Sequence, residues 1–150
     1  GEQKRVLRLI PGLENAEFVR YGVMHRNTYV NAPTVLNNAM EVKSRPGLFL
    51  AGQMTGVEGY LESAAIGILA GINAARVAAD QQIVTPPRET ALGSLCSYLT
   101  ETEPKRFAPM NANFGIMPEL PEKIKDKREK AKRKGEIALN SITRWVNELK

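Results

Sequence analysis

The longest apolar pattern in the chain lies between residues 59 and 81 and predicts a buried helix. Small residues recur there at every fourth position, in the order Gly59, Ser63, Gly67, Gly71, Ala75 and Ala79. This spacing places them in one ridge along a helix. Leucine, isoleucine and valine occupy the other faces, and a helix that is apolar almost all round is typically buried. Glycine inside a helix costs roughly 1 kcal/mol relative to alanine, so Gly67 and Gly71 indicate close packing against a sheet or a cofactor.

A membrane-spanning helix is the alternative explanation of this pattern. Polar and charged residues interrupt the run at Glu62, Asn73, Arg76 and Asp80. No uninterrupted apolar stretch of about 18 residues remains, so we expect no membrane contact.

The remaining pattern predicts short strands and further helices. Strand-forming residues predict extended segments at 17–30, 40–43 and 48–51. Prolines suited to a first helical turn predict helices at 32–38 and 85–99. Four prolines make residues 100–121 a long irregular segment. A last helical region is expected after Pro121, bent at Gly135, with an apolar face that docks its C-terminal half.

A glycine-rich turn before the long helix is the strongest candidate for a ligand site. The apolar strand at 48–51 runs into it, and Gly52, Gly56 and Gly59 let a ligand approach the backbone. Unpaired N–H groups and the helix dipole favour a phosphate or an anionic ring edge at such a helix start. An ordinary strand-to-helix turn is the alternative, since a glycine pattern by itself is weak evidence.

Three separated blocks resemble one family in the same order. They read RLIPGLENAEFVRYGVMHRNTYVNAP, GLFLAGQMTGVEGYLESAAIGILAGINAAR and PMNANFGIMPEL, and cover most of residues 5–121. They are similar to the C-terminal flavin-binding segment of the TrmFO family, the folate- and FAD-dependent tRNA (uracil-5-)-methyltransferases that make ribothymidine in the T-loop. A related flavoprotein family that modifies the wobble uridine is the alternative, although residues 57–63 fit TrmFO better.

The resemblance implies an α/β fold, namely the C-terminal part of a Rossmann-like FAD-binding domain of the two-dinucleotide-binding-domain flavoprotein type. Residues 1–100 would belong to that domain, 101–121 would connect it, and 122–150 would form a basic, amphipathic helical tail. The chain has neither an initiator Met nor a GxGxxG motif after a strand. We therefore expect a C-terminal piece whose partner is the N-terminal remainder of the same polypeptide. That remainder would carry the catalytic cysteines, so we expect no catalytic residue in this piece and no activity from it alone.

The reaction implied for the parent enzyme transfers a one-carbon unit from 5,10-methylenetetrahydrofolate to C5 of the T-loop uridine. FAD reduced by NAD(P)H would be the reductant. The resemblance places FAD contacts in the glycine-rich turn, at Gly52, Gln53, Gly56, Val57, Glu58, Gly59 and Tyr60. Backbone N–H groups of residues 57–59 would face the flavin pyrimidine edge, and the Gln53 amide would face the ribityl chain. Folate contacts are expected from His25, Asn27, Asn111 and Asn113.

Each of these assignments has a structural alternative. His25 could pair with a neighbour on a strand, and Gln53 could cap the turn. Tyr60 could fill the core rather than stack on a substrate. Residues 111–115 could satisfy their own polar groups through asparagine turns. Glu58 and Glu62 share one face of a first helical turn, where acids commonly complement the helix dipole.

Positive charge is concentrated in one short segment. Residues 123–134 contain eight basic and two acidic side chains, whereas the whole chain has a net charge of +5. A solvated helix face is one explanation, and the family resemblance favours contact with tRNA phosphates. The candidate tRNA contacts are Lys127, Arg128, Lys130, Lys132, Arg133 and Lys134. A non-enzymatic basic RNA-binding module is a further alternative for the whole chain.

The chain has one cysteine, Cys96, and one histidine, His25. This composition excludes an internal disulfide and argues against a zinc site made by the protein alone, so no metal is expected. No signal peptide is visible, which predicts a cytoplasmic location.

Overall fold

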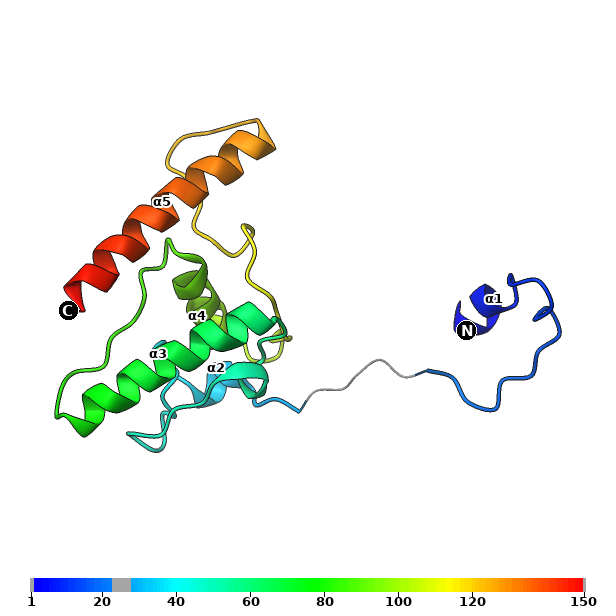
Figure 1. The fold of residues 1–150 in the computed structure, drawn as a ribbon, viewed down its shortest axis with the longest axis horizontal. Coiled ribbons are helices and arrows are strands. Elements are labelled where there is room, and N and C mark those ends of the chain that lie inside the picture. Colours follow the sequence, from blue (N-terminus) through cyan, green and yellow to red (C-terminus); the bar gives the residue numbers. More distant parts are fainter. Residues whose placement is uncertain (1, 23–27, 150) are drawn as a thin grey trace.

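The computed structural model describes residues 2–22 and 28–149, and helices dominate this part of the chain (Figure 1). The N-terminal segment contains one short helix, α1 (Glu2–Leu7), which has no buried residue. The remaining elements are α2 (Ala32–Val35), the 3-10 turn η1 (Gly52–Thr55), α3 (Tyr60–Ala78), α4 (Ala91–Glu101) and α5 (Lys127–Glu148).

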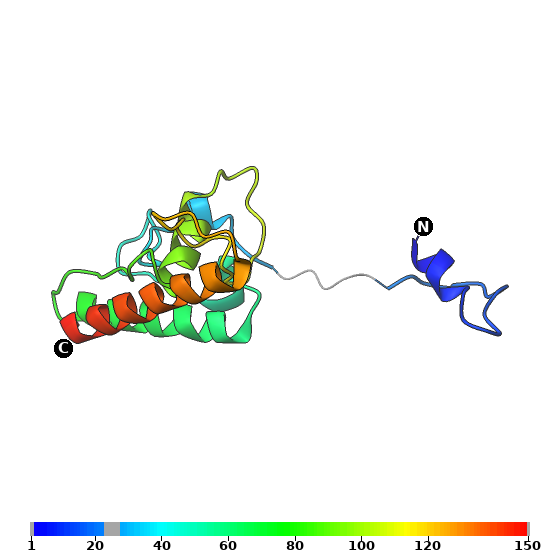
Figure 2. The ribbon, with the colours of Figure 1, turned by 90° about the horizontal axis from the view of Figure 1, so that it is seen from above.

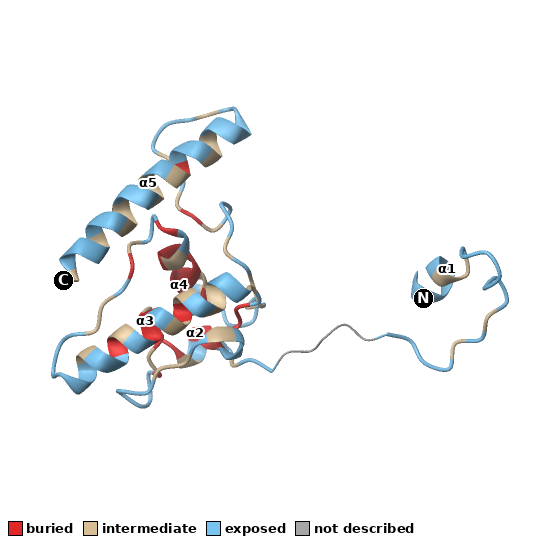
Figure 3. Ribbon diagram, viewed as in Figure 1, coloured by how far each residue is buried: buried red, intermediate tan, exposed pale blue. Residues whose placement is uncertain are grey.

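The core lies where α2, α3 and α4 meet, as the buried residues in Figure 3 show. Its members are Ala32, Leu36, Met40, Val42, Val57, Ile66, Leu69, Leu95, Cys96 and Leu99. Trp145 from α5 packs against this cluster, as predicted for the apolar face of the C-terminal helix, whereas Val146 of the same predicted face is 44% exposed. Figures 1 and 2 show α5 as one long helix at the edge of this body.

The predicted strands are reduced to isolated bridges in the described residues. Leu36 pairs with Val42 and Glu41 with Phe49, both antiparallel, and Val57 pairs with Met110 in parallel. Residues 17–22 and 28–30 are not in a strand, and the predicted segment between them lies outside the described residues. A strand requires a ladder of hydrogen bonds with a partner, and single bridges do not make one. The described residues by themselves therefore do not form an α/β or Rossmann-like layer.

The helix predictions differ in accuracy. α3 lies within its predicted range, whereas α2 is shorter than predicted. α4 begins at Ala91 instead of Thr85, because Thr90 is its N-cap and accepts a hydrogen bond from the Gly93 N–H at 2.9 Å. α5 runs through Gly135 as one continuous helix, and Figures 1 and 2 show no bend in it, so the predicted bend is wrong.

The small-residue ridge of α3 does not face the core. The buried residues of α3 lie on another side of the helix and are Ile66, Leu69, Ala70 and Asn73. A Cβ added at Gly67 or Gly71 would have no heavy atom within 4 Å. Tyr60, Leu61 and Ile68 are 96%, 85% and 65% exposed. The prediction of a helix buried all round is therefore wrong for the part of the protein that the structure describes.

The apolar character of α3 also bears on the membrane prediction. By length and composition alone, α3 is long and apolar enough to cross a membrane. The core helices of soluble proteins have the same length and composition, so these two properties do not identify a membrane span. Asn73 argues for a core helix, because its buried amide donates to the carbonyl oxygens of Ala39 and Val84.

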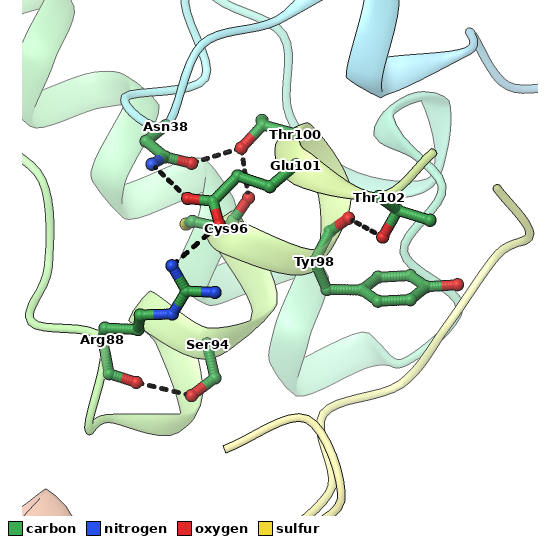
Figure 4. A network of polar contacts seen from close by, with 8 residues as sticks. All are labelled: Asn38, Arg88, Ser94, Cys96, Tyr98, Thr100, Glu101 and Thr102. Carbon is green, nitrogen blue, oxygen red and sulfur yellow. Dashed lines mark hydrogen bonds and ion pairs between the residues drawn. The ribbon is translucent and has the colours of Figure 1, made fainter. Parts of the chain in front are cut away.

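A polar network joins the turn after α2 to α4 (Figure 4). The Asn38 amide donates to Glu101 at 3.0 Å and accepts from the Thr100 hydroxyl. Arg88 forms an ion pair with Glu101 at 2.8 Å, and the Ser94 hydroxyl donates to the Arg88 carbonyl. The hydrogen bond from Asn38, with a smaller contribution from Arg88, lowers the pKa of Glu101. The network therefore fixes α4 against the loop that precedes the glycine-rich turn.

Cys96 lies in α4 and is 1% exposed. Burial raises the pKa of its thiol to about 12. The thiolate is the reactive form, so we expect Cys96 to resist disulfide reagents in the native protein and to react on unfolding. Labelling in native buffer and in denaturant at the same mildly alkaline pH measures this. Rapid labelling in native buffer would show that α4 opens readily.

Candidate functional site

The glycine-rich turn uses backbone conformations that favour glycine. Gly52 and Gly56 have φ values of +67° and +90°. Gly56 also lies against the Phe107 ring, since an added Cβ would be 2.5 Å from its Cζ atom. A side chain at Gly56 would therefore disturb the turn whether or not a ligand binds there.

The segment at Met110 holds this turn in place. The Met110 N–H donates to the Gly56 carbonyl at 2.9 Å, and the Glu58 N–H donates to the Met110 carbonyl at 3.4 Å. Val57, between them, is fully buried. Val57 is thus inaccessible and the Glu58 N–H has an internal acceptor, so the expectation that all three N–H groups of residues 57–59 face a flavin needs correction at Val57 and Glu58.

Glu62 folds back over the start of α3. A Cβ added at Gly59 would meet the Glu62 carboxylate, with Oε1 at 2.9 Å. The same oxygen accepts a hydrogen bond from the Ala112 N–H at 3.2 Å. A glutamate three residues after the N-cap that reaches back to the helix start resembles a capping box. Glu62 therefore joins the start of α3 to the 111–113 loop, and this geometry favours the dipole-complement interpretation.

The outer side of the turn suits a flavin edge in two respects. Gln53, Glu58 and Tyr60 are exposed, so their polar groups are accessible. The first N–H groups of α3 have no acceptor within a helix, and the helix dipole favours electron-rich atoms there. A cavity of about 290 Å³ opens between α3 and α4, beside the start of α3. Its lining is apolar apart from Glu62 and comprises Leu61, Glu62, Ala65, Ala91, Leu92, Leu95 and Ala112.

The folate candidates are only partly described. His25 and Asn27 lie outside the described residues. Asn113 is engaged within its own loop, because its Oδ1 accepts from the Gly115 N–H at 2.8 Å and its Nδ2 donates to the Asn111 carbonyl at 3.0 Å. Asn111 is exposed and close in sequence to the Ala112 contact with Glu62. The structure therefore brings Asn111, but not a free Asn113 amide, to the start of α3.

The basic candidates on α5 fall into two groups. Lys127, Arg128 and Lys132 are exposed, and none forms an ion pair within the described ranges. The other three are engaged internally. Lys130 pairs with a glutamate of the preceding loop at 2.5 Å, and Arg133 pairs with two glutamates at 3.3 and 3.4 Å.

Lys134 is a structural residue. It is 4% exposed, and its Nζ donates to the carbonyl oxygens of Phe114 at 3.0 Å and Met117 at 3.1 Å. A buried ammonium needs such partners to offset the loss of water. The Lys134 ammonium is therefore bonded inside the fold in this structure, and its contact with tRNA stays a prediction. Its position four residues before Ala138, on the apolar face of α5, is the sequence signal that indicates an inward side chain.

Comparison with known proteins identifies the class. Residues 1–82, more than half of the chain, match the family model described as "Glucose inhibited division protein A". The chain belongs to this family. The flavoprotein part of the fold prediction agrees with that membership.

Individual relatives are more specific. The chain is 65% identical over 130 residues to "Methylenetetrahydrofolate--tRNA-(uracil-5-)-methyltransferase TrmFO" of Enterococcus faecalis, covering 87% of this chain and 30% of that protein. It is 58% identical over 149 residues to the protein of the same name from Listeria monocytogenes serotype 4b, covering 99% and 34%. These relatives confirm the predicted resemblance to TrmFO, and the chain spans about one third of their length. Among solved structures, GidA of Aquifex aeolicus in its form II crystal is 38% identical, with a TM-score of 0.46, covering 65% of this chain and 16% of that one.

Proposed function

We propose that the chain is part of a tRNA-modifying flavoenzyme. The enzyme would transfer a one-carbon unit from 5,10-methylenetetrahydrofolate to C5 of the T-loop uridine, with FAD as cofactor and NAD(P)H as reductant. The observation that carries this proposal is the high identity, over nearly the whole chain, to relatives that bear this name. A cytoplasmic location fits the same function, because tRNA is modified there.

The share of the chain in that enzyme would be the C-terminal part of the FAD site, part of the folate site and a basic helix for tRNA. FAD would supply the reduction of the one-carbon unit. The Gly59 N–H and the first N–H groups of α3 would donate to the flavin edge, and Gln53 would contact the ribityl chain. Glu62 would keep the 111–113 loop beside that edge. The Rossmann-like layer would form only together with the remainder of the polypeptide.

The test is reconstitution of the full-length polypeptide with an unmodified tRNA transcript, methylenetetrahydrofolate and NAD(P)H. We expect a bound-flavin absorbance spectrum and a new methyl group at the T-loop uridine. The 150-residue chain alone should transfer none. Modification at the wobble uridine would favour the related flavoprotein family. RNA binding without flavin or methyl transfer would favour the non-enzymatic module.

The open ridge of α3 should pack against the remainder of the polypeptide. We expect Gly67→Leu to lower the stability of the full-length protein by about 1–3 kcal/mol through overpacking. The same substitution meets open space in this chain, since a Cβ there has no neighbour within 4 Å. Thermal unfolding of the full-length variant measures the effect. An unchanged Tm would mean that the ridge faces solvent in the whole protein too.

The exposed bases of α5 should contribute to tRNA affinity without base specificity. Alanine at Lys127, Arg128 or Lys132 should each flatten the dependence of log K on log salt by a little under one unit, because each phosphate contact releases counterions. The position of methylation should not change. Binding isotherms at several salt concentrations measure the slope. Slopes equal to that of the wild type would identify a solvated helix face.

A further inference from the structure

A groove with basic and aromatic walls lies between the first half of α5 and the loop before it. Its volume is about 210 Å³. Its lining residues are Phe114, Gly115, Glu119, Lys127, Lys130, Ala131 and Lys134. Figure 1 shows the two segments that form it, the loop after α4 and the N-terminal half of α5. The fold thus brings together two stretches that the sequence separates, one with an aromatic residue and one with lysines.

Phe114 offers this groove a stacking surface. It lines the groove and is 51% exposed, so part of its side chain is accessible to a ligand. Its backbone is fixed on one side by Lys134 and on the other by the Asn113 turn. Exposed aromatic rings next to cationic side chains are how many proteins bind unstacked bases, since every base has a π-face.

The Glu119 carboxylate forms ion pairs with two lysines of the groove. Its Oε2 lies 2.5 Å from the Lys130 Nζ, and its Oε1 lies 3.8 Å from the Lys134 Nζ. The hydrogen bond from Lys130, and then the charges of Lys130 and Lys134, lower the pKa of Glu119, so it stays an anion. Its side chain is 73% exposed, so another anion can replace it with little desolvation cost. A phosphate group presents the same kind of oxygen atoms to these lysines.

We infer that this groove binds one nucleotide of single-stranded or looped RNA. The phosphate contacts Lys127 and Lys130 in place of the Glu119 carboxylate, and the base stacks on Phe114. Lys134 is a positioning residue, because it holds the Phe114 carbonyl. The inference rests on the proposed function, to which it adds the subsite that takes an unstacked nucleotide and an internal carboxylate that competes with the phosphate.

The competition is tested by comparing Glu119→Gln with Glu136→Gln in the full-length protein. Each substitution removes one negative charge, but Glu136 pairs with Arg133 and does not line the groove. A labelled, unmodified tRNA transcript at low salt is the probe. We expect Glu119→Gln to bind about two- to fivefold more tightly than Glu136→Gln, the range of an exposed ion pair. Equal affinities of these two variants would overturn the displacement of Glu119.

Stacking is tested with Phe114→Leu and Phe114→Trp on the same transcript. Leucine keeps the apolar bulk and removes the ring, so binding should weaken about 5- to 150-fold, whereas tryptophan should restore it. Binding of a perfect RNA duplex, whose bases are already stacked, should be the same for all three proteins. A Phe114→Leu variant that binds the transcript as the wild type does would overturn the inference.

These outcomes separate the inference from the function on which it rests. If the wild type methylates the T-loop uridine while the Glu119 and Phe114 variants behave like their controls, the groove is not the nucleotide subsite and the proposed function stands. If the wild type neither binds nor methylates the transcript, both proposals are wrong. Failure of tryptophan to restore binding in a protein with unchanged Tm would also contradict stacking.

Discussion

Gly93→Ala should be among the most destabilising single substitutions in this chain. A Cβ at Gly93 would lie 2.5 Å from the carbonyl carbon of Pro87 and 2.8 Å from the Pro86 carbonyl oxygen, with the Pro87 oxygen closer still. These are backbone atoms of a turn with two prolines, which cannot rotate away as a side chain can. We expect a loss of about 3 kcal/mol in the free energy of unfolding, the upper end of the usual overpacking cost. The loss is measured by thermal or urea unfolding of the full-length polypeptide.

The matched control is Gly135→Ala in the middle of α5. A Cβ there would have no neighbour within 4 Å, and alanine is a better helix former than glycine. We expect this variant to gain about 0.5–1 kcal/mol. If Gly93→Ala unfolded at the wild-type temperature, the Pro86–Pro87 turn would not be packed on α4 as the structure has it.

The sequence contains two possible start signals for α4, Pro86 and Thr90, and the prediction relied on Pro86. Pro86 suits a first helical turn, which predicts a helix start at Thr85. The structure instead uses Thr90, whose side chain caps α4, so Pro86 and Pro87 form the turn that Gly93 packs against. Proline in a first turn and threonine as an N-cap are both common at helix starts. Only the packing of the Pro86–Pro87 turn on α4 decides between them. By contrast, α3 and α5 could be predicted because long periodic segments leave fewer alternatives.

The strands could not be predicted as they occur, for a different reason. The residues at 40–43 and 48–51 have strand-forming side chains, but a strand exists only where a partner pairs with it over several residues. Within the described residues, Glu41 and Phe49 pair through one bridge. The parallel bridge between Val57 and Met110 was not predicted, because no pattern in the sequence indicates a contact across so many residues.

The sequence predicts which segment forms the candidate site better than it predicts which backbone atoms of that segment are free. The glycines at 52, 56 and 59 do form a turn at the start of a long helix, and two of them have positive φ. The glycine pattern could not indicate that atoms of this turn also make contacts within the protein. Glu58 gives its N–H to Met110, and Gly56 packs on Phe107. These contacts come from the loop after α4, which the sequence describes only as irregular.

The proposed flavin contact of the glycine-rich turn is best tested at Gly59, where the expected effect is loss of the cofactor. Gly59→Val in the full-length protein should reduce bound flavin by at least about tenfold, the effect of 1.4 kcal/mol in binding. A branched side chain would occupy the space beside the N–H groups that are proposed to face the flavin edge. Gly56→Val is a poorer test, because its φ of +90° and the Phe107 ring make that variant disturb the turn itself. Gly59 has a φ of −80°, which any residue adopts.

The control for Gly59→Val is a substitution at Glu62, because a side chain at residue 59 would displace the Glu62 carboxylate. Glu62→Ala alone removes that contact and should keep the flavin, with a small loss of stability at the start of α3. The double variant Gly59→Val, Glu62→Ala relieves the clash and should still lose the flavin, because the valine remains beside the N–H groups. Absorbance of the purified proteins near the flavin maximum, normalised to protein, gives the occupancy, and Tm shows whether each variant is folded. A folded double variant with wild-type flavin occupancy would mean that Gly59 does not face the cofactor. The effect of Gly59→Val would then come from moving Glu62 and the 111–113 loop that it holds.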